Sequence, residues 1–520
     1  MTLLQIFAIA GVCLPVVLML LAMLPPQRRA SPRAAKWNRF NLLSAAALML
    51  TLLAVILPGK GHILQPWLHP TPLGGVLALL VQLLGTVIGA FSSRYLEGEH
   101  GQQRYISALS GVLAAVHLLL LADHWAVLIV AWALVGVALQ HLLCFYPDRP
   151  FALLAAYKKR IADRVADVAL LGAAALAWNA VGSGSFSELW VHVAREGMST
   201  ALHASAVCLV LAVILRTALL PVHGWLLQVM EAPTPVSALL HAGVVNLGGF
   251  VLIRFAPLME HATFARALLI AFGLGTAVLA GLVMLTRISI KVRLAWSTVA
   301  QMGFMVLECG LGLYTLAALH LIGHSLYKAH AFLSASTVVR ETRLQFLRGV
   351  TAPAPFSLFL APVVAVSVVW LIQSVANPVA WPWWWSAVMG LAWAPVLWLS
   401  AQRTGLRSHA FQGMTGVLMI AGLSAAALLA HALPLGVLDI PQHTLGLITL
   451  LAMAAVYLLL VVLQLRPQAL HAWRRWSYAG FYVDEIYTRL ALRLWPGRWT
   501  PDQQHGEKRA LPALAADERP

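Results

Sequence analysis

Long apolar runs separated by short polar loops recur along almost the whole sequence. A helix needs about 20 mainly apolar residues to cross a bilayer, so runs of this length predict about 14–15 membrane-spanning helices. We expect spans near residues 3–24, 40–58, 73–91, 105–121, 125–146, 161–180, 202–226, 235–256, 265–286, 290–309, 312–339, 354–375, 383–400, 414–433 and 444–465. The pattern therefore predicts an all-α polytopic membrane protein.

The composition agrees with this class of protein. Of 520 residues, 60% are hydrophobic and only 10% are charged, and the mean hydropathy is +0.81. The net charge of +16 does not indicate a nucleic-acid partner, because the basic residues lie in short loops rather than on one face of a domain. The cysteines lie singly in apolar runs, which predicts small buried side chains and no disulfide framework: Cys13, Cys144, Cys208 and Cys309.

The basic loops predict how the chain is oriented. The first apolar run is too long for a signal-peptide core and lacks a cleavage site, so we expect it to stay as a spanning helix. The positive-inside rule places the basic loop after it in the cytoplasm and the N-terminus outside, and an odd number of spans leaves the C-terminus in the cytoplasm of an inner-membrane protein. Outside loops carry little beyond Lys60 and Arg195, whereas inside loops carry Arg28, Arg29, Arg33, Lys36, Arg39, Arg94, Arg104, Lys158, Lys159, Arg160, Arg287, Arg293, Arg340, Arg343, Arg348, Arg403 and Arg407.

The segment from Arg466 to Pro520 is more polar, with arginines interspersed among Trp and Tyr. We expect an amphipathic interfacial helix around Phe481 to Leu494 and a loose tail after Pro496. Its aromatic and basic side chains fit a membrane-surface anchor and a docking element for a cytoplasmic partner equally well.

A row of ionisable residues lies inside the apolar run that begins near Tyr314. His320, His324 and Lys328 are spaced four apart, so they share one face of a helix. A lysine in mid-membrane costs about 2.5–3.5 kcal/mol and is tolerated chiefly where it faces a protein interior or a water-filled path. Histidine exchanges its proton near neutral pH, and a buried lysine releases its proton more readily than an exposed one. The row therefore predicts a proton or ion path.

Neighbouring runs add further ionisable groups that lipid would disfavour. We place His241 and Lys291 in the same path, with Arg216 as a fixed positive charge because arginine hardly deprotonates. The other ionisable residues in these apolar runs are His223, Glu231 and His330. Arg164 and Asp167 lie three apart, and they fit either a structural ion pair or a supporting role in the path.

Prolines interrupt two of the predicted spans, at Pro221 and at Pro233 and Pro235. A proline removes a helical hydrogen bond, and freed backbone groups at membrane depth must be buried in protein or line a cavity. We therefore predict broken helices at a transport site, with a simple packing kink as the alternative.

The sequence contains little that indicates catalysis by this chain. His320 and His324 fit a two-histidine metal pattern, but Lys328 would repel a metal and no nearby Asp, Glu or Cys completes a ligand set. Phosphate loops, Ser/His/Asp arrangements and paired carboxylates do not stand out. We expect a transport subunit without a metal or cofactor of its own.

Three motifs resemble the proton-conducting antiporter-like membrane subunits of respiratory complex I, Mrp cation/proton antiporters and membrane-bound hydrogenases. They are Pro233-Thr-Pro-Val-Ser-Ala-Leu-Leu-His241-Ala, Ile290-Lys291 with Leu294-Ala-Trp-Ser-Thr-Val-Ala-Gln301-Met-Gly, and His320-Leu-Ile-Gly-His324 with Lys328. The resemblance covers roughly residues 75–345. It implies an antiporter-like inverted-repeat fold with discontinuous seventh and twelfth helices, of which only the seventh is visibly broken here. It also implies a central hydrophilic axis through His241, Lys291, His320, His324 and Lys328, and a sixth-helix motif at Arg164 and Asp167.

The chain departs from that family's pattern at three places. Trp132 is followed by Ala133 where the family usually has a glutamate, and Arg216 replaces a lysine. No lysine occurs between Lys328 and Lys508, so the usual twelfth-helix lysine is absent. The resemblance therefore does not imply orthodox pumping of the complex I kind.

The segment Phe481-Tyr-Val-Asp484-Glu-Ile-Tyr487 resembles a motif of the large antiporter-like subunits. We see no apolar segment after it that could form the long lateral helix and terminal anchor of those subunits. A divergent family member of this kind resembles the membrane subunit of the two-component DAB-type inorganic carbon accumulation system. In that family the partner is a large soluble zinc protein resembling a β-carbonic anhydrase, of the DabA type.

From these features we expect a subunit that conducts a cation, with H+ favoured over Na+, and that powers a cytoplasmic partner capturing CO2 as bicarbonate. Zinc is expected in that partner only. The alternatives are a subunit of a redox-driven pump, a Na+/H+ antiporter subunit, and a scaffold with a vestigial path. The expected organisation is N-terminal helices over 1–72, a path core over 73–345, C-terminal helices over 346–465 and a tail over 466–520.

Overall fold

The computed structural model describes residues 3–25, 33–57, 66–335, 352–375, 380–401, 405–466, 468–469 and 471–495. Helices dominate these residues, and their only β-pairings are three isolated bridges, which confirms the all-α prediction. Some predictions fall outside the described residues: those for Arg28, Arg29, Lys60, Arg340, Arg343, Arg348 and Arg403, the end of the span 312–339, and the loose tail after Pro496. The expected division at 72, 345 and 465 stays a prediction.

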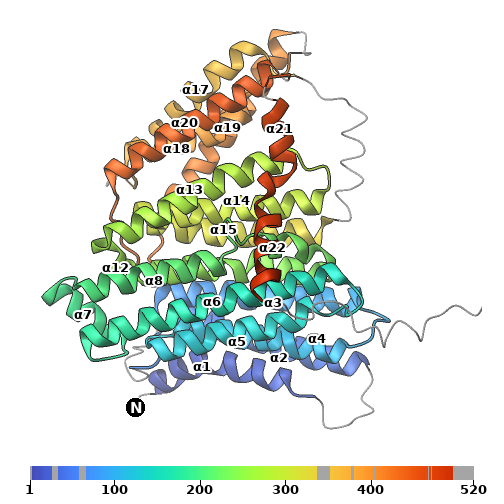
Figure 1. Cartoon of the computed structure of the whole chain (residues 1–520), viewed down its shortest axis with the longest axis vertical. Coiled ribbons are helices and arrows are strands. Elements are labelled where there is room, and N and C mark those ends of the chain that lie inside the picture. Colours follow the sequence, from blue (N-terminus) through green and yellow to red (C-terminus); the bar gives the residue numbers. More distant parts are fainter. Residues whose placement is uncertain are drawn as a thin grey trace, which may run out of the picture.

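Every predicted span coincides with a helix, and the long helices lie side by side in layers (Figure 1). Ten helices in the described part of the chain are long and apolar enough to cross a membrane. The other five predicted spans fall on helices that are shorter or carry several polar residues. These are α1 (Leu3–Met23), α6 (Pro150–Val181), α8 (Thr200–Arg216), α15 (Tyr314–Leu333) and α18 (Trp383–Trp393).

The N-terminal half forms the lower part of Figure 1. Its other long helices are α2 (Arg33–Ile56), α3 (Pro72–Tyr95), α4 (Gln102–Leu121) and α5 (Trp125–Leu143). The amphipathic α7 (Phe186–Glu196) and the short α12 (Ala256–His261) join the longer elements. Together with α8 and the centre of the chain they bury one large apolar core.

The chain is broken on both sides of Pro221, as predicted, but the prolines have different roles. After α8 the backbone bends through Pro221 into the short α9 (Gly224–Gln228) and η2 (Val229–Glu231). Pro233 and Pro235 instead begin α10 (Thr234–Ala242), because proline is well suited to the first turn of a helix. The span predicted over 235–256 breaks further along, at Gly243 and η3 (Val244–Asn246), before α11 (Leu247–Arg254).

The break expected in the twelfth helix is not found in the twelfth predicted span. That span is the continuous α17 (Pro355–Ser374), although Pro362 lies inside it. The thirteenth span changes instead from α18 into η4 (Ala394–Leu397).

The helices α13 (Thr263–Leu285) and α14 (Ile290–Leu311) meet backbone to backbone at a glycine pair. A β-carbon at Gly303 would lie 2.7 Å from the carbonyl oxygen of Gly273 and 2.7 Å from the amide nitrogen of Ala277. Only glycine allows this approach.

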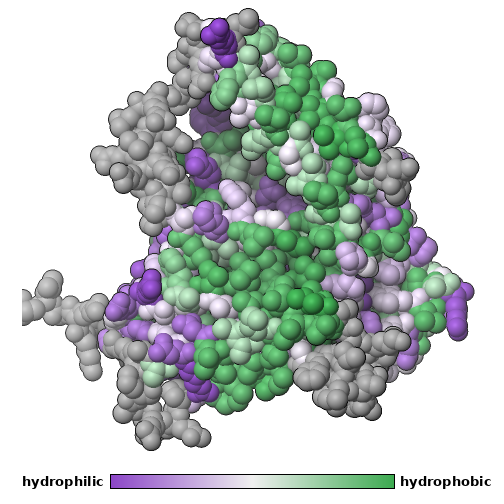
Figure 2. Space-filling model, turned by 180° about the vertical axis from the view of Figure 1, so that it is seen from behind, coloured by the Kyte–Doolittle hydropathy of each residue, from purple (hydrophilic) through white to green (hydrophobic). Residues whose placement is uncertain are grey.

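The C-terminal block contains α17, α18, α19 (Leu406–His431) and α20 (His443–Leu465) around a second apolar core (Figure 1). From this block α21 (His471–Tyr478) and α22 (Val483–Leu494) run back across the other helices toward α6 and α9. The predicted amphipathic helix over 481–494 is thus present as α22. Figure 2 shows broad hydrophobic surfaces on both blocks with a hollow between them, as expected of a chain embedded in lipid.

Candidate functional site

The predicted row on α15 faces the protein interior. Lys328 and His324 are buried. The Lys328 ammonium donates to the carbonyl oxygen of Leu294 on α14 at 2.9 Å, and Nε2 of His324 donates to the carbonyl oxygen of His241 at 3.2 Å. The rings of His320 and His324 are 6.0 Å apart. The helical spacing therefore predicted one face correctly, and neighbouring backbone carbonyls stabilise its polar groups.

An acid that we did not predict completes the row. Glu308 on α14 lies with one carboxylate oxygen 2.8 Å from Nδ1 of His320. We expected no acid near these histidines, which was wrong. Gly312, with φ of +77°, closes the turn between α14 and α15, so residues on either side of the turn face each other. This hairpin is the one sequence signal that could have revealed the pair.

The Glu308–His320 pair lies in the wall of a crevice of about 550 Å³ between α13, α14, α18 and α20. Most of its lining is apolar, and Ser297 and Gln301 add polar groups along α14. The predicted row is therefore not sealed at this end.

His241 connects the broken helix to the row. Its side chain is fully buried and stacks on Phe332 with ring centroids 4.5 Å apart. Neither ring nitrogen has a hydrogen-bond partner among the described residues. Nearby, Asn246 at the break donates to Ser325 on α15 at 2.8 Å. Buried polar groups without partners are rare in proteins, so His241 calls for a functional explanation.

Lys291 lies at the start of α14, apart from the row. Its ammonium donates to the hydroxyl of Thr234 at 3.0 Å, and Thr234 is 3.3 Å from the hydroxyl of Tyr95. The described contacts do not join Lys291 directly to Lys328. Its predicted place in the path stays a prediction.

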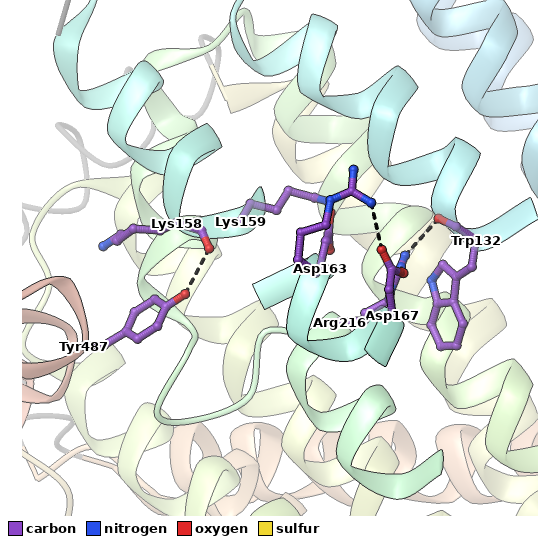
Figure 3. Close-up of polar contacts among 8 residues, drawn as sticks. Trp132, Lys158, Lys159, Asp163, Asp167, Arg216 and Tyr487 are labelled. Atoms are coloured by element: carbon purple, nitrogen blue, oxygen red, sulfur yellow. Dashed lines mark hydrogen bonds and ion pairs between the residues drawn. The ribbon is translucent and has the colours of Figure 1, made fainter. Parts of the chain in front are cut away.

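Arg216 belongs to a separate group of charges along α6 (Figure 3). It pairs with Asp167 and donates to the carbonyl oxygen of Trp132 at 2.8 Å. On the preceding turns of α6, Lys159 pairs with Asp163. We call Lys159, Asp163, Asp167 and Arg216 the α6 ion-pair group.

The predicted pair of Arg164 and Asp167 is confirmed, at 3.1 Å. The Arg164 side chain is 64% exposed, whereas that of Arg216 is 4% exposed, so the buried partner of Asp167 is Arg216. Ala133 and Gly136 line a cavity of about 100 Å³ beside Asp163, Asp167 and Arg216. The carboxylates near Arg216 thus come from α6 rather than from the position after Trp132.

Comparisons with known proteins identify the family of this chain. A protein-family model described as "NADH:quinone oxidoreductase/Mrp antiporter, TM" matches residues 122–351, which include α6, the broken helix and the α15 row. The "Probable inorganic carbon transporter subunit DabB" of Hydrogenovibrio crunogenus is 38% identical over 486 residues, covering 90% of this chain and 91% of that protein. The chain belongs to the DabB family of antiporter-like membrane subunits.

Other relatives place the DabB family within a broader group. "Probable inorganic carbon transporter subunit DabB2" of Halothiobacillus neapolitanus is 42% identical over 347 residues, covering 64% of this chain and 63% of that protein. "NADH-ubiquinone oxidoreductase chain 5" of Metridium senile is 33% identical over 292 residues, covering 55% of this chain and 48% of that protein. The fold is similar to a chain of the Mrp complex from Dietzia sp., with a TM-score of 0.60 and 23% identity over 94% of this chain and 60% of that one. The expected resemblance to antiporter-like subunits is confirmed.

Proposed function

We propose that this chain conducts a cation, H+, through the membrane as a subunit of an inorganic carbon uptake complex. The observation that carries the proposal is the series Glu308, His320, His324, His241 and Lys328, of which all but His320 are buried, in a member of the DabB family. Lys328 and His324 are bonded to backbone carbonyls, so each can gain or lose a proton without breaking a buried ion pair. Glu308 and His320 are bonded to each other and can exchange a proton between them.

The orientation predicted by the basic loops gives the path a direction. With the N-terminus outside, α14 runs outward and α15 runs inward, so Glu308 and His320 lie nearer the outer side than Lys328. Lys291 and Thr234 lie nearer the cytoplasm. Protons enter at the Glu308–His320 pair, pass His324 and His241, and reach Lys328. Arg216, held by Asp167, sets the local potential.

The coupled reaction takes place in a partner rather than in this chain. The relatives are named as inorganic carbon transporter subunits, and we propose a large soluble DabA-type partner on the cytoplasmic side that resembles a zinc β-carbonic anhydrase and captures CO2 as bicarbonate. One charge moving down 100 mV supplies about 2.3 kcal/mol, enough to bias the partner's equilibrium severalfold to tens-fold. This chain holds no metal or cofactor in the proposal.

A test is rescue of a carbonic-anhydrase-deficient bacterial host growing in ordinary air. Co-expression of the chain with its soluble partner should restore growth, and a protonophore should abolish uptake of labelled inorganic carbon. Purification through a tag on this chain should recover one large zinc protein. Recovery of quinone-reactive or iron–sulfur subunits instead, without rescue, would contradict the proposal.

The second candidate is a subunit of a complex I-like redox pump or an Mrp-type Na+/H+ antiporter. The family match over 122–351 favours it equally. It predicts electron transfer activity or Na+-dependent proton flux in the purified complex, neither of which a carbon uptake complex requires.

A further inference from the structure

The C-terminal helix α22 binds a buried lysine of α6. Lys158 is fully buried, and its ammonium donates to both carboxylate oxygens of Asp484, at 2.7 and 3.0 Å, and to the hydroxyl of Thr488 at 3.0 Å. An ammonium has three N–H donors. The hydrogen bonds of Lys158 thus all go to α22, although the two helices are more than 300 residues apart in sequence.

Asp484 is also tightly seated against α9. A β-carbon placed on Gly224 would overlap the Asp484 carboxylate, so only glycine leaves room for it. The side chain of Asp484 remains 24% exposed, whereas that of Lys158 is 0% exposed. One carboxylate therefore contacts both solvent and a buried cation.

His223, directly before Gly224, connects the Asp484–Lys158 pair with the α15 row. Its ring is fully buried, and neither nitrogen has a hydrogen-bond partner among the described residues. The Asp484 carboxylate packs against Gly224, the next residue along the chain. On its other side the ring lies 5.0 Å from that of Trp296, two residues along α14 from Leu294, whose carbonyl binds Lys328.

Tyr487 fixes α22 in this position. Its hydroxyl donates to the backbone carbonyl of Lys158 at 2.9 Å (Figure 3). Burial and the nearby carboxylates of Asp484 and Asp163 raise the pKa of Tyr487, so the hydroxyl stays protonated and able to donate. Figure 3 shows Lys158 extending toward α22 and Lys159 extending the other way, toward Asp163 and Arg216. Lys158 therefore belongs to the tail contact rather than to the α6 ion-pair group.

We propose that Asp484 is the cytoplasmic access residue of the conduction path, and that His223 and Lys158 connect it to Lys328. The inference rests on the proposed proton conduction and identifies the cytoplasmic end of the conduction path. A proton leaves the Lys158 ammonium along the bond to Asp484, giving a neutral amine and a carboxylic acid. Asp484 then releases that proton to cytoplasmic water. A proton arriving from the side of Lys328 converts the neutral His223 ring to an imidazolium, which passes one proton to the neutral Lys158 amine and returns to its neutral form.

The test compares two neighbouring acids in the full chain purified with its partner and reconstituted in liposomes. D484N removes the access carboxylate, and the matched control E485Q removes an exposed charge one residue away. We expect D484N to lower voltage-driven proton flux at least about tenfold, as for loss of a proton-transfer group. E485Q should stay within about twofold of the unaltered chain, because an exposed acid transfers no proton here. D484E should recover part of the flux, which a merely structural role would not predict.

The remaining outcomes separate this inference from the proposed function. Unchanged flux in D484N, with flux lost in K328A, would overturn the access role and leave conduction intact. Unchanged flux in both variants would overturn the proposed function itself. Should D484N assemble poorly, the double variant K158M/D484N removes both charges together and avoids an unpaired buried lysine. Wild-type flux in that folded double variant would equally contradict the inference.

Discussion

The α15 row and the α6 ion-pair group both carry charge into the membrane, and they stabilise it in different ways. In the α6 group each described cation has a carboxylate partner: Lys159 has Asp163, and Arg216 has Asp167. In the row, His320 has the carboxylate partner Glu308, whereas Lys328 and His324 are bonded to backbone carbonyls. A fixed ion pair resists a change of protonation because either change leaves a buried charge unpaired. A group bonded to a neutral carbonyl can lose its proton at lower cost.

In the proposed function, the α6 group maintains a constant local charge and the row moves charge. Substitutions in each group test this contrast. A substitution in the row should change transport and leave assembly intact, whereas a substitution in the α6 group should change stability first.

The largest effect is expected at Lys328. K328A should lower proton flux about 10³-fold, the range for loss of a positioned proton-transfer group, while the partner still co-purifies. K328R sharpens the test, because arginine keeps the charge and hardly releases a proton. Flux is measured with a pH-sensitive dye in liposomes. K328R conducting like the unaltered chain would mean that only the charge of this residue matters.

The next effect concerns stability. R216M leaves Asp167 with only the exposed Arg164, and breaking a buried pair from one side should cost about 3 kcal/mol. Thermal unfolding in detergent should show the loss, and the double variant D167N/R216M should recover part of it. Equal stability of R216M and the unaltered chain would show that the pair does not stabilise the fold.

A smaller effect is expected at Glu308. E308Q keeps a hydrogen-bond acceptor for His320 and removes the charge, so proton flux should fall about tenfold with little change in stability. The matched control is Q301A, which changes the lining of the same crevice without contacting the row. Equal losses in both variants would mean that the shape of the crevice, rather than the acid, controls flux.

The smallest effect is expected at Arg164. Its side chain is 64% exposed, and exposed pairs are worth about 0.2–1 kcal/mol. R164A should therefore leave both the unfolding temperature and proton flux nearly unchanged. A loss as large as that of R216M would move Arg164 into the buried part of the α6 group.

Local patterns were enough to predict the helices and one face of the site. Apolar runs predicted the spans, and spacing of three or four residues predicted the α15 row and the Arg164–Asp167 pair. Such periodicity describes one helix at a time. It does not say which neighbouring helix a face meets.

Contacts between helices account for what the sequence missed. Glu308 reaches His320 across a turn, Arg216 reaches Asp167 from another helix, and Asp484 reaches Lys158 from the far end of the chain. The break at Gly243 was also missed, because the prolines just before it were the stronger local signal and turned out to begin a helix.

The glycine contact between α13 and α14 has a mechanical consequence. Because backbone touches backbone at Gly273 and Gly303, α13 and α14 have no layer of side chains between them at this point that could compress or re-pack. In the crevice, the wall formed by α18 and α20 presents bulky side chains such as Trp385 and Tyr457. The contact between α13 and α14 is therefore stiff where the two glycines meet, whereas the wall formed by α18 and α20 can change its side-chain packing.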